Sequence, residues 1–296
     1  MRILFKSDVL QKQFEQDGFV KVQLLSTEEV NELLNGYQKV AALHEQINIS
    51  FITTSHSNNP ALIKKVDEIL QKVMAPAIDK ILTDYKLLFG NYLVKIPGES
   101  SETEPHQDIT FVDESEFVSV SVWVALQDMS MENGCMYFLR GSQNLMPTIR
   151  PTHNYPWFYE HVKEDIKQAA EVFTVKTGEA FIFNHAIIHG SFAHHTAPKR
   201  IAAVMAAYNA EAPLIHYYLP DSRSNILQKF SMTKEAYLHF VKLQPPAKGV
   251  FIGEEKYEFK QLKKKEFFLM LRNGKKISVL QKLTAWFTKE ESVVNG

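Results

Sequence analysis

Residues 117–126 read FVSVSVWVAL, in which every second residue is valine or leucine. Side chains of a β-strand point alternately to opposite faces, so one face of this segment is aliphatic throughout. The other face carries Ser119, Ser121 and Trp123, a polar and aromatic mixture that suits the wall of a cavity. The stretch therefore predicts a strand with one face in a hydrophobic core and the other in a functional site.

Other short strand-like segments surround this one. They occupy residues 92–96, 135–139, 180–184 and 201–208, and they are separated by turn residues. Asn133-Gly134 is a strong turn signal and predicts a hairpin that returns the chain along 135–139. Several short strands with few helices favour a mainly β fold, a jelly-roll (double-stranded β-helix, cupin-like) barrel.

The first 88 residues read mainly as helix. Ser26 and Glu29 have the spacing of a capping box before an apolar-periodic run. Residues 60–82 continue with aliphatic side chains at helical spacing, and residues 18–23 look like a short strand. We expect these flanking helices to pack on the barrel.

The length and pattern predict a single catalytic domain over residues 1–296. It comprises a helical N-terminal region (1–88), a jelly-roll core (89–215) and a C-terminal extension (216–296). Within the core, residues 143–173 are proline-broken and aromatic, which predicts a lid loop beside the barrel mouth. In the extension, lysines interleaved with Phe and Leu predict an amphipathic helix that covers part of the core and has a solvated basic face.

Composition excludes several classes. The formal net charge of −1 gives no general attraction to nucleic acid or acidic membranes. Cys135 is the only cysteine, which excludes an internal disulfide and a multi-cysteine zinc site. Charges interrupt every apolar segment, and the N-terminus lacks the apolar run of a signal peptide. We expect a cytoplasmic protein without a membrane span; the sequence does not indicate an oligomeric state.

Three residues have the pattern of a metal site. In an extended chain, His106 and Asp108 point the same way, and His189 follows an apolar strand from another part of the sheet. Iron(II) in oxygenases takes two imidazoles, one carboxylate and open positions. His185, His194 and His195 compete with His189, and periodicity does not choose among them. The Gly-Ser that follows His189 favours it; we interpret His185 as a packed histidine and the other two as exposed loop residues.

Arg200 predicts a site for a short dicarboxylic acid. Its same-face neighbours Ala202 and Val204 are small, and a planar guanidinium binds a carboxylate through two hydrogen bonds. Ser191 offers a hydroxyl donor to the same carboxylate.

These motifs together resemble the phytanoyl-CoA dioxygenase family over residues 92–209. The shared run comprises His106-Gln-Asp108, Trp123, Glu132-Asn-Gly134-Cys, Gly141-Ser142, His189-Gly-Ser191 and Arg200. The resemblance implies that His106, Asp108 and His189 bind iron. It also implies that Arg200 and Ser191 hold the far carboxylate of 2-oxoglutarate, with Trp123 beside the cosubstrate. We add Lys95 to these expected cosubstrate contacts.

The activity implied is that of an Fe(II)- and 2-oxoglutarate-dependent dioxygenase. Such an enzyme hydroxylates a C–H bond of a small molecule and releases succinate and CO2, and ascorbate can serve as a reductant. Related halogenases lack the carboxylate ligand, so Asp108 favours hydroxylation. One alternative is a non-catalytic jelly-roll sensor or scaffold that binds a metal or a small acid. Another is a zinc hydrolase, which leaves Arg200 and Ser191 unexplained.

The substrate pocket is less well defined. Substrates of the family range from acyl thioesters to small polar metabolites. The sequence shows no strongly basic motif that would bind the nucleotide of coenzyme A, which favours a small polar metabolite. The candidate lining residues are Lys95, Gln107, Phe111, Arg150 and His153.

Overall fold

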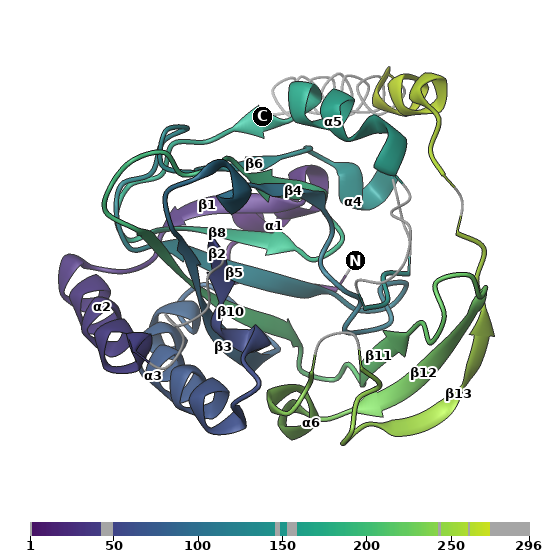
Figure 1. Cartoon of the computed structure of the whole chain (residues 1–296), viewed down its shortest axis with the longest axis horizontal. Helices are drawn as coiled ribbons and strands as arrows, with labels where there is room; N and C mark the ends of the chain where they lie inside the picture. Colours follow the sequence, from purple (N-terminus) through teal and green to yellow (C-terminus); the bar gives the residue numbers. More distant parts are fainter. Residues whose placement is uncertain are drawn as a thin grey trace, which may run out of the picture.

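Two antiparallel sheets form the barrel of the computed structural model (Figure 1), which describes residues 2–42, 50–145, 149–152, 159–241, 244–259 and 261–272. The six-stranded sheet has the order β1 (Phe19–Gln23), β8 (Glu179–Asn184), β5 (Ser119–Ala125), β10 (Arg200–Asn209), β3 (Tyr85–Lys95) and β2 (Phe51–Thr53). The four-stranded sheet has the order β4 (Thr103–His106), β9 (His189–Ser191), β6 (Met136–Phe138) and β7 (Glu171–Val172). The predicted mainly β fold with flanking helices is confirmed.

Strand β5 divides two hydrophobic clusters as its alternation predicted. Val120, Val122 and Val124 belong to the larger cluster, which the N-terminal helices share. Trp123 belongs to the cluster between the two sheets, together with Phe138 of β6. The face of β5 that carries Ser121 and Trp123 therefore looks into the barrel, and both side chains line a cavity there.

The N-terminal helices cover the outer face of the larger sheet, as Figure 1 shows for α2 (Thr27–Ala41) and α3 (Pro60–Ile78). The capping box is present, because the Ser26 side chain accepts from the backbone of Glu29 and the Glu29 side chain accepts from the backbone of Ser26. Helix α3 packs on β3 and β10. The shorter α1 (Asp8–Asp17) precedes β1, which pairs with β8 and so makes the N-terminal region part of the barrel.

The predicted hairpin at Asn133-Gly134 is wrong in its pairing. The turn exists, with Gly134 at φ 85° and the Asn133 side chain accepting from the backbone of Ser130. However, β5 pairs with β8 and β10, whereas β6 pairs with β9 and β7. The turn therefore carries the chain from one sheet to the other. Turn residues specify a local reversal and leave open which sheet the next strand joins.

A separate three-stranded sheet, which the sequence analysis did not predict, begins at the end of the expected core and continues into the C-terminal extension. Its strands are β11 (Leu214–Tyr218), β12 (Ile226–Met232) and β13 (Val250–Lys256), with the short helix α6 (Lys234–Leu238) between the last two. The predicted amphipathic helix is present at residues 264–272, where Phe267 is buried. It packs in a cluster with Ile166 of α5 (Lys163–Ala169) and with Leu139 and Ile188, which adjoin β6 and β9, so it covers part of the core as expected.

The predicted lid segment is only partly described. Its described elements are α4 (Ser142–Leu145), the 3-10 turn η3 (Glu160–Val162), α5 and strand β7, whereas residues 146–148 and 153–158 lie outside the described residues. Two short 3-10 turns, η1 (Thr54–His56) and η2 (Glu99–Ser101), complete the elements.

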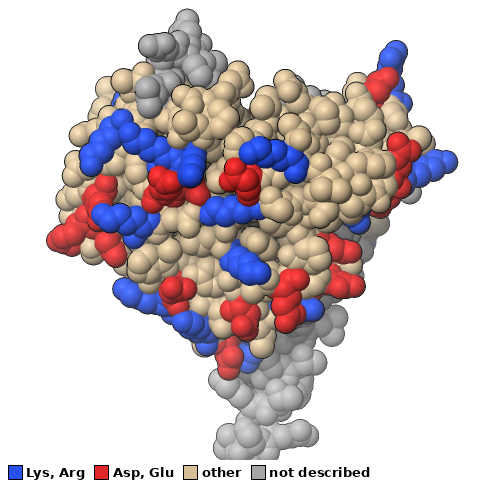
Figure 2. Space-filling model, turned by 90° about the horizontal axis from the view of Figure 1, so that it is seen from below, with Lys and Arg blue, Asp and Glu red and all other residues tan. Residues whose placement is uncertain are grey.

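The surface shows no single-sign patch on the face of Figure 2, where Lys and Arg are interspersed with Asp and Glu. Within the described ranges, no helix is long and apolar enough to cross a membrane.

Candidate active site

The three candidate metal ligands converge where β4 and β9 pair. His106 and His189 face each other across the ladder, with ring centroids 4.2 Å apart. Asp108 follows β4 directly, and its Oδ1 lies 4.0 Å from His106 Nε2. The potential ligand atoms of all three residues lie within 4.8 Å of one another. Adjacent strands therefore bring together residues that are more than eighty positions apart in the chain.

Backbone carbonyls fix the tautomer of both histidines. The Nδ1 atom of His106 lies 2.9 Å from the carbonyl oxygen of Glu104, and Nδ1 of His189 lies 3.1 Å from that of Ile187. A carbonyl can only accept, so each Nδ1 carries the proton and donates it. Each Nε2 then keeps its lone pair for a metal, the arrangement usual for metal-binding histidines.

The protonation states also suit metal binding. Burial, followed by the neighbouring His106, lowers the pKa of His189 to about 3, so its imidazole is neutral. Burial alone would raise the pKa of Asp108, but the attraction of the neighbouring histidines for its carboxylate and the hydrogen bond from Ser121 outweigh burial and lower the pKa. Metals bind neutral imidazole and ionised carboxylate. Two imidazoles and one carboxylate at one point fit iron(II).

His185, the competing distal ligand, has both ring nitrogens engaged by serines. Its Nδ1 lies 2.8 Å from Ser119 Oγ and its Nε2 lies 3.1 Å from Ser121 Oγ. The side chain is buried and 3.9 Å from Asp108 Oδ2, to which Ser121 donates a hydrogen bond of 3.2 Å. The interpretation of His185 as a packed histidine is confirmed, and it orients the Asp108 carboxylate together with Ser121.

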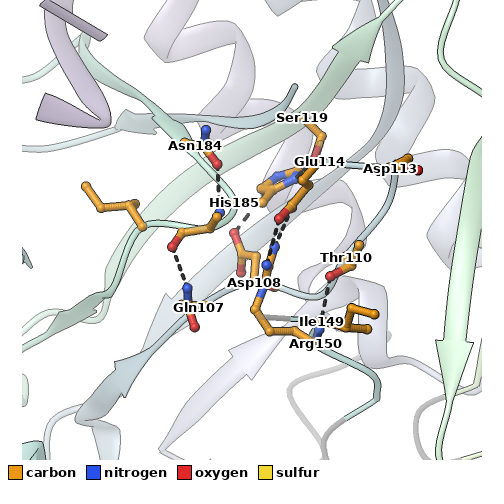
Figure 3. A network of polar contacts seen from close by, with 12 residues as sticks. Gln107, Asp108, Thr110, Asp113, Glu114, Ser119, Ile149, Arg150, Asn184 and His185 are labelled. Atoms are coloured by element: carbon orange, nitrogen blue, oxygen red, sulfur yellow. Dashed lines mark hydrogen bonds and ion pairs between the residues drawn. The ribbon is translucent and has the colours of Figure 1, made fainter. Parts of the chain in front are cut away.

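A buried polar network holds the backbone around Asp108 (Figure 3). The Arg150 side chain, 1% exposed, donates from Nε to the Asp108 carbonyl oxygen at 2.7 Å and forms a two-pronged ion pair with Glu114. The amide of Asp108 donates to the carbonyl of His185, and the Gln107 side chain donates to the carbonyl of Ala186 at 2.6 Å. Gln107 and Arg150 were candidate lining residues, but among the described residues neither lines the cavity.

We expect Arg150→Met to weaken iron(II) binding and to destabilise the fold by at least about 2 kcal/mol, because it leaves Glu114 without its buried partner and frees the Asp108 carbonyl. Urea unfolding and anaerobic equilibrium dialysis with iron(II) measure the two effects. Arg140→Met is the matched control: Arg140 is also doubly ion-paired, with Asp17 and Glu171, away from the cavity. It should lower stability only. Unchanged iron affinity in Arg150→Met would show that the network does not position Asp108.

Arg200 presents unused donors inside the barrel. Its side chain is 1% exposed, its Nη2 donates to the Gly134 carbonyl at 2.7 Å, and its guanidinium lies over the Trp123 ring at 5.7 Å. Nε and Nη1 are buried and have no hydrogen-bond partner among the described residues. Burial lowers the pKa of Arg200 to about 10, so it stays charged at neutral pH. A buried cation with free donors fits an incoming carboxylate.

One cavity of about 560 Å³ contains both the histidine–aspartate cluster and Arg200. Ser191 and Trp123 also line it, and its volume lies in the usual range for small-molecule sites. The structure thus brings together six of the seven predicted site residues.

Lys95 is the exception, because it does not line the described cavity. Its Nζ donates to the carbonyl oxygens of Ser191 and Phe192, at 3.2 and 2.5 Å. Burial, with the nearby Arg200, lowers the pKa of Lys95 to about 6. Lys95 therefore extends from the inward face of β3 to the strand that carries Ser191, which it supports without lining the cavity.

Other predicted positions have mixed outcomes. His194 was expected to be exposed but is buried, because its Nε2 bonds to the Pro198 carbonyl and its backbone amide donates to Ser101 Oγ. His195 is exposed as predicted. Phe111 lines the cavity, whereas His153 lies outside the described residues.

Several cavity residues were not predicted at all. Phe89 of β3, Tyr237 of α6 and Phe240 line the cavity beside Phe111. Their sequence positions carry no chemical motif; only the packing of α6 against β3 brings them to the site.

Known proteins resemble this chain over part of its length. "Phytanoyl-CoA dioxygenase domain-containing protein 1" of Danio rerio is 32% identical over 121 residues, 38% of this chain and 42% of that protein. "Phytanoyl-CoA dioxygenase 1" of Oryza sativa subsp. japonica is 28% identical over 123 residues, 40% of this chain and 43% of that protein. The similarity thus spans less than half the length of these curated relatives.

Solved structures share the fold at low sequence identity. The non-heme alpha ketoglutarate dependent carbocyclase SnoK from nogalamycin biosynthesis has a TM-score of 0.50 and 19% identity, over 70% of this chain and 86% of that one. The epimerase SnoN, solved with Fe3+, alpha ketoglutarate and nogalamycin RO, has a TM-score of 0.51 and 19% identity, over 88% of this chain and 96% of that one. The family model for phytanoyl-CoA dioxygenase (PhyH) matches residues 14–202, more than half of the sequence. This chain therefore belongs to the phytanoyl-CoA dioxygenase family.

Proposed function

We propose that this protein is an Fe(II)- and 2-oxoglutarate-dependent dioxygenase that hydroxylates a small molecule. His106, Asp108 and His189 hold the iron, and Arg200 with Ser191 holds the far carboxylate of 2-oxoglutarate. The observation that carries the proposal is the presence of a metal-ligand cluster and a buried arginine with free donors in one cavity. Membership of the phytanoyl-CoA dioxygenase family supports it.

The protein contributes orientation and a dry site. The carbonyls of Glu104 and Ile187 hold both imidazoles with Nε2 toward the metal position. Ser121 and His185 orient the carboxylate of Asp108, and Arg200 orients the cosubstrate against Trp123. When bound, iron and 2-oxoglutarate supply the oxidising chemistry, with dioxygen consumed and succinate and CO2 released. The apolar side chains between the two sheets exclude water from this chemistry.

Hydroxylation is the outcome that Asp108 favours over halogenation. Its carboxylate lies at the third ligand position, which is the position that a halide would need. We expect hydroxylated product alone, even in high chloride, when products are analysed by mass spectrometry. A chlorinated product from the unmodified protein would contradict this assignment.

A screen of cell metabolites against the iron-loaded protein tests the proposed function. Consumption of a substrate together with stoichiometric succinate is the expected result. Consumption that needs no 2-oxoglutarate would instead indicate a zinc hydrolase. Metal and 2-oxoglutarate binding without any succinate would indicate a sensor or scaffold.

A further inference from the structure

The cavity continues from the metal position to an aromatic wall formed by Phe89, Phe111, Tyr237 and Phe240. The ring centroids of Phe111 and Tyr237 are 5.2 Å apart, and that of Phe89 lies 6.0 Å from Phe111 and 6.1 Å from Tyr237. Phe240 follows at 6.5 Å from Tyr237. These rings form one continuous surface, because each lies within ordinary aromatic contact of its neighbour.

The aromatic wall adjoins the reacting end of the cavity. The ring of Phe111 lies 4.9 Å from that of His185, which in turn lies 3.9 Å from Asp108 Oδ2. A molecule that lies against Phe111 is therefore close to the metal position. Arg200, by contrast, reaches the cavity from β10 and contacts Trp123. Substrate and cosubstrate thus have separate surfaces in the same cavity.

The wall offers no spare polar group from Tyr237. Its hydroxyl donates to the carbonyl of Ile215 at 2.6 Å, so the ring presents its carbon atoms to the cavity. Of the charged side chains that line the described cavity, Glu104 and Lys163 pair with each other at 2.8 Å. The other two, Asp108 and Arg200, are the proposed metal ligand and cosubstrate anchor. A substrate with a fixed charge would lose its hydration here and meet no unpaired opposite charge, only neutral polar groups such as Thr53 and Asn91.

Resting on the proposed function, we propose that the primary substrate is an uncharged apolar molecule whose rings or hydrocarbon chain lie against this aromatic wall. This differs from the small polar metabolite that the sequence favoured. Tyr237 and Phe240 lie beyond residues 14–202, the part that matches the family model. The C-terminal extension therefore supplies half of the wall, while the family core supplies Phe89, Phe111 and the metal and cosubstrate site.

Calorimetric titration with 2-naphthol tests the proposal. The ligand is added without oxygen to protein loaded with iron(II) and 2-oxoglutarate, and 2-naphthyl sulfate serves as the charged counterpart with the same ring. We expect 2-naphthol to bind and the sulfate to bind at least about tenfold more weakly. In Phe240→Gln, 2-naphthol affinity should fall about tenfold, because a polar side chain replaces an apolar contact.

Two variants control for folding and for general loss of apolar surface. Phe240→Leu keeps the wall apolar and should bind 2-naphthol within about threefold of the unmodified protein. Phe268→Gln makes the same chemical change at an aromatic residue that is 47% exposed and outside the cavity lining, so it should have no effect. Absent 2-naphthol binding, equal or tighter binding of the sulfate, or unchanged affinity in Phe240→Gln overturns the proposal. A separate titration with 2-oxoglutarate tests the proposed function itself. If the iron-loaded protein does not bind 2-oxoglutarate, the proposed function fails, independently of the result with 2-naphthol.

Discussion

Asp108→Ala is expected to abolish turnover and to lower iron(II) affinity more than about 100-fold, since even residues that only support a metal ligand contribute 10–100-fold. The substitution removes the only carboxylate of the described cluster and leaves two neutral imidazoles. Anaerobic equilibrium dialysis against iron(II) measures the loss. Asp128→Ala is the matched control, because it removes a carboxylate that pairs with Lys176 on the surface. It should retain full iron binding.

The distal ligand is tested by the same measurement on two histidines. His189→Ala should lose iron binding as Asp108→Ala does, because its Nε2 lies in the cluster. His185→Ala should weaken binding less, because it acts only by orienting Asp108 through Ser121. If His189→Ala kept full iron-dependent activity while His185→Ala lost it, the ligand choice would be wrong.

Arg200→Ala is expected to weaken 2-oxoglutarate binding by roughly one and a half to four decades, which corresponds to about 2–5 kcal/mol for a desolvated charge pair. Iron binding should largely survive, since Arg200 is not part of the ligand cluster. The 2-oxoglutarate affinity of Arg200→Lys should lie between those of the unmodified protein and Arg200→Ala, because lysine keeps the charge and loses the planar pair of donors. Anaerobic titration of 2-oxoglutarate into the iron-loaded variants, followed by charge-transfer absorbance, gives the affinities.

Arg223→Ala provides the control for this titration. Arg223 is an exposed arginine that pairs with Asp221 on the surface, so its loss should leave 2-oxoglutarate affinity unchanged. Unchanged affinity in Arg200→Ala as well would mean that the cosubstrate binds elsewhere.

The fold was predictable where local patterns and burial agree. The alternation in residues 117–126 predicted both faces of β5, because a strand must place alternate side chains in different environments. The capping box at Ser26 predicted the start of α2 for a similarly local reason. The turn at Asn133-Gly134 was equally predictable, but the sheet that the next strand joins depends on which strands are neighbours in space.

The cluster of candidate metal ligands was predictable from the sequence, whereas the residues that support this cluster were not. His106, Asp108, His189 and Arg200 have unusual chemistry in a recognisable order, so the sequence indicates them. Glu114 and Arg150 act through an ion pair that forms only when residues 149–152 lie against the segment after β4. The aromatic wall likewise depends on the packing of α6, which no local pattern specifies.

The most direct test of the dioxygenase assignment is the fate of oxygen. Protein supplied with iron(II), 2-oxoglutarate, a metabolite extract and ¹⁸O-labelled dioxygen should form succinate that carries the label, and Asp108→Ala should form none. Mass spectrometry of the succinate reads the result. Unlabelled succinate, or no succinate from a protein that binds iron and 2-oxoglutarate, would contradict the assignment.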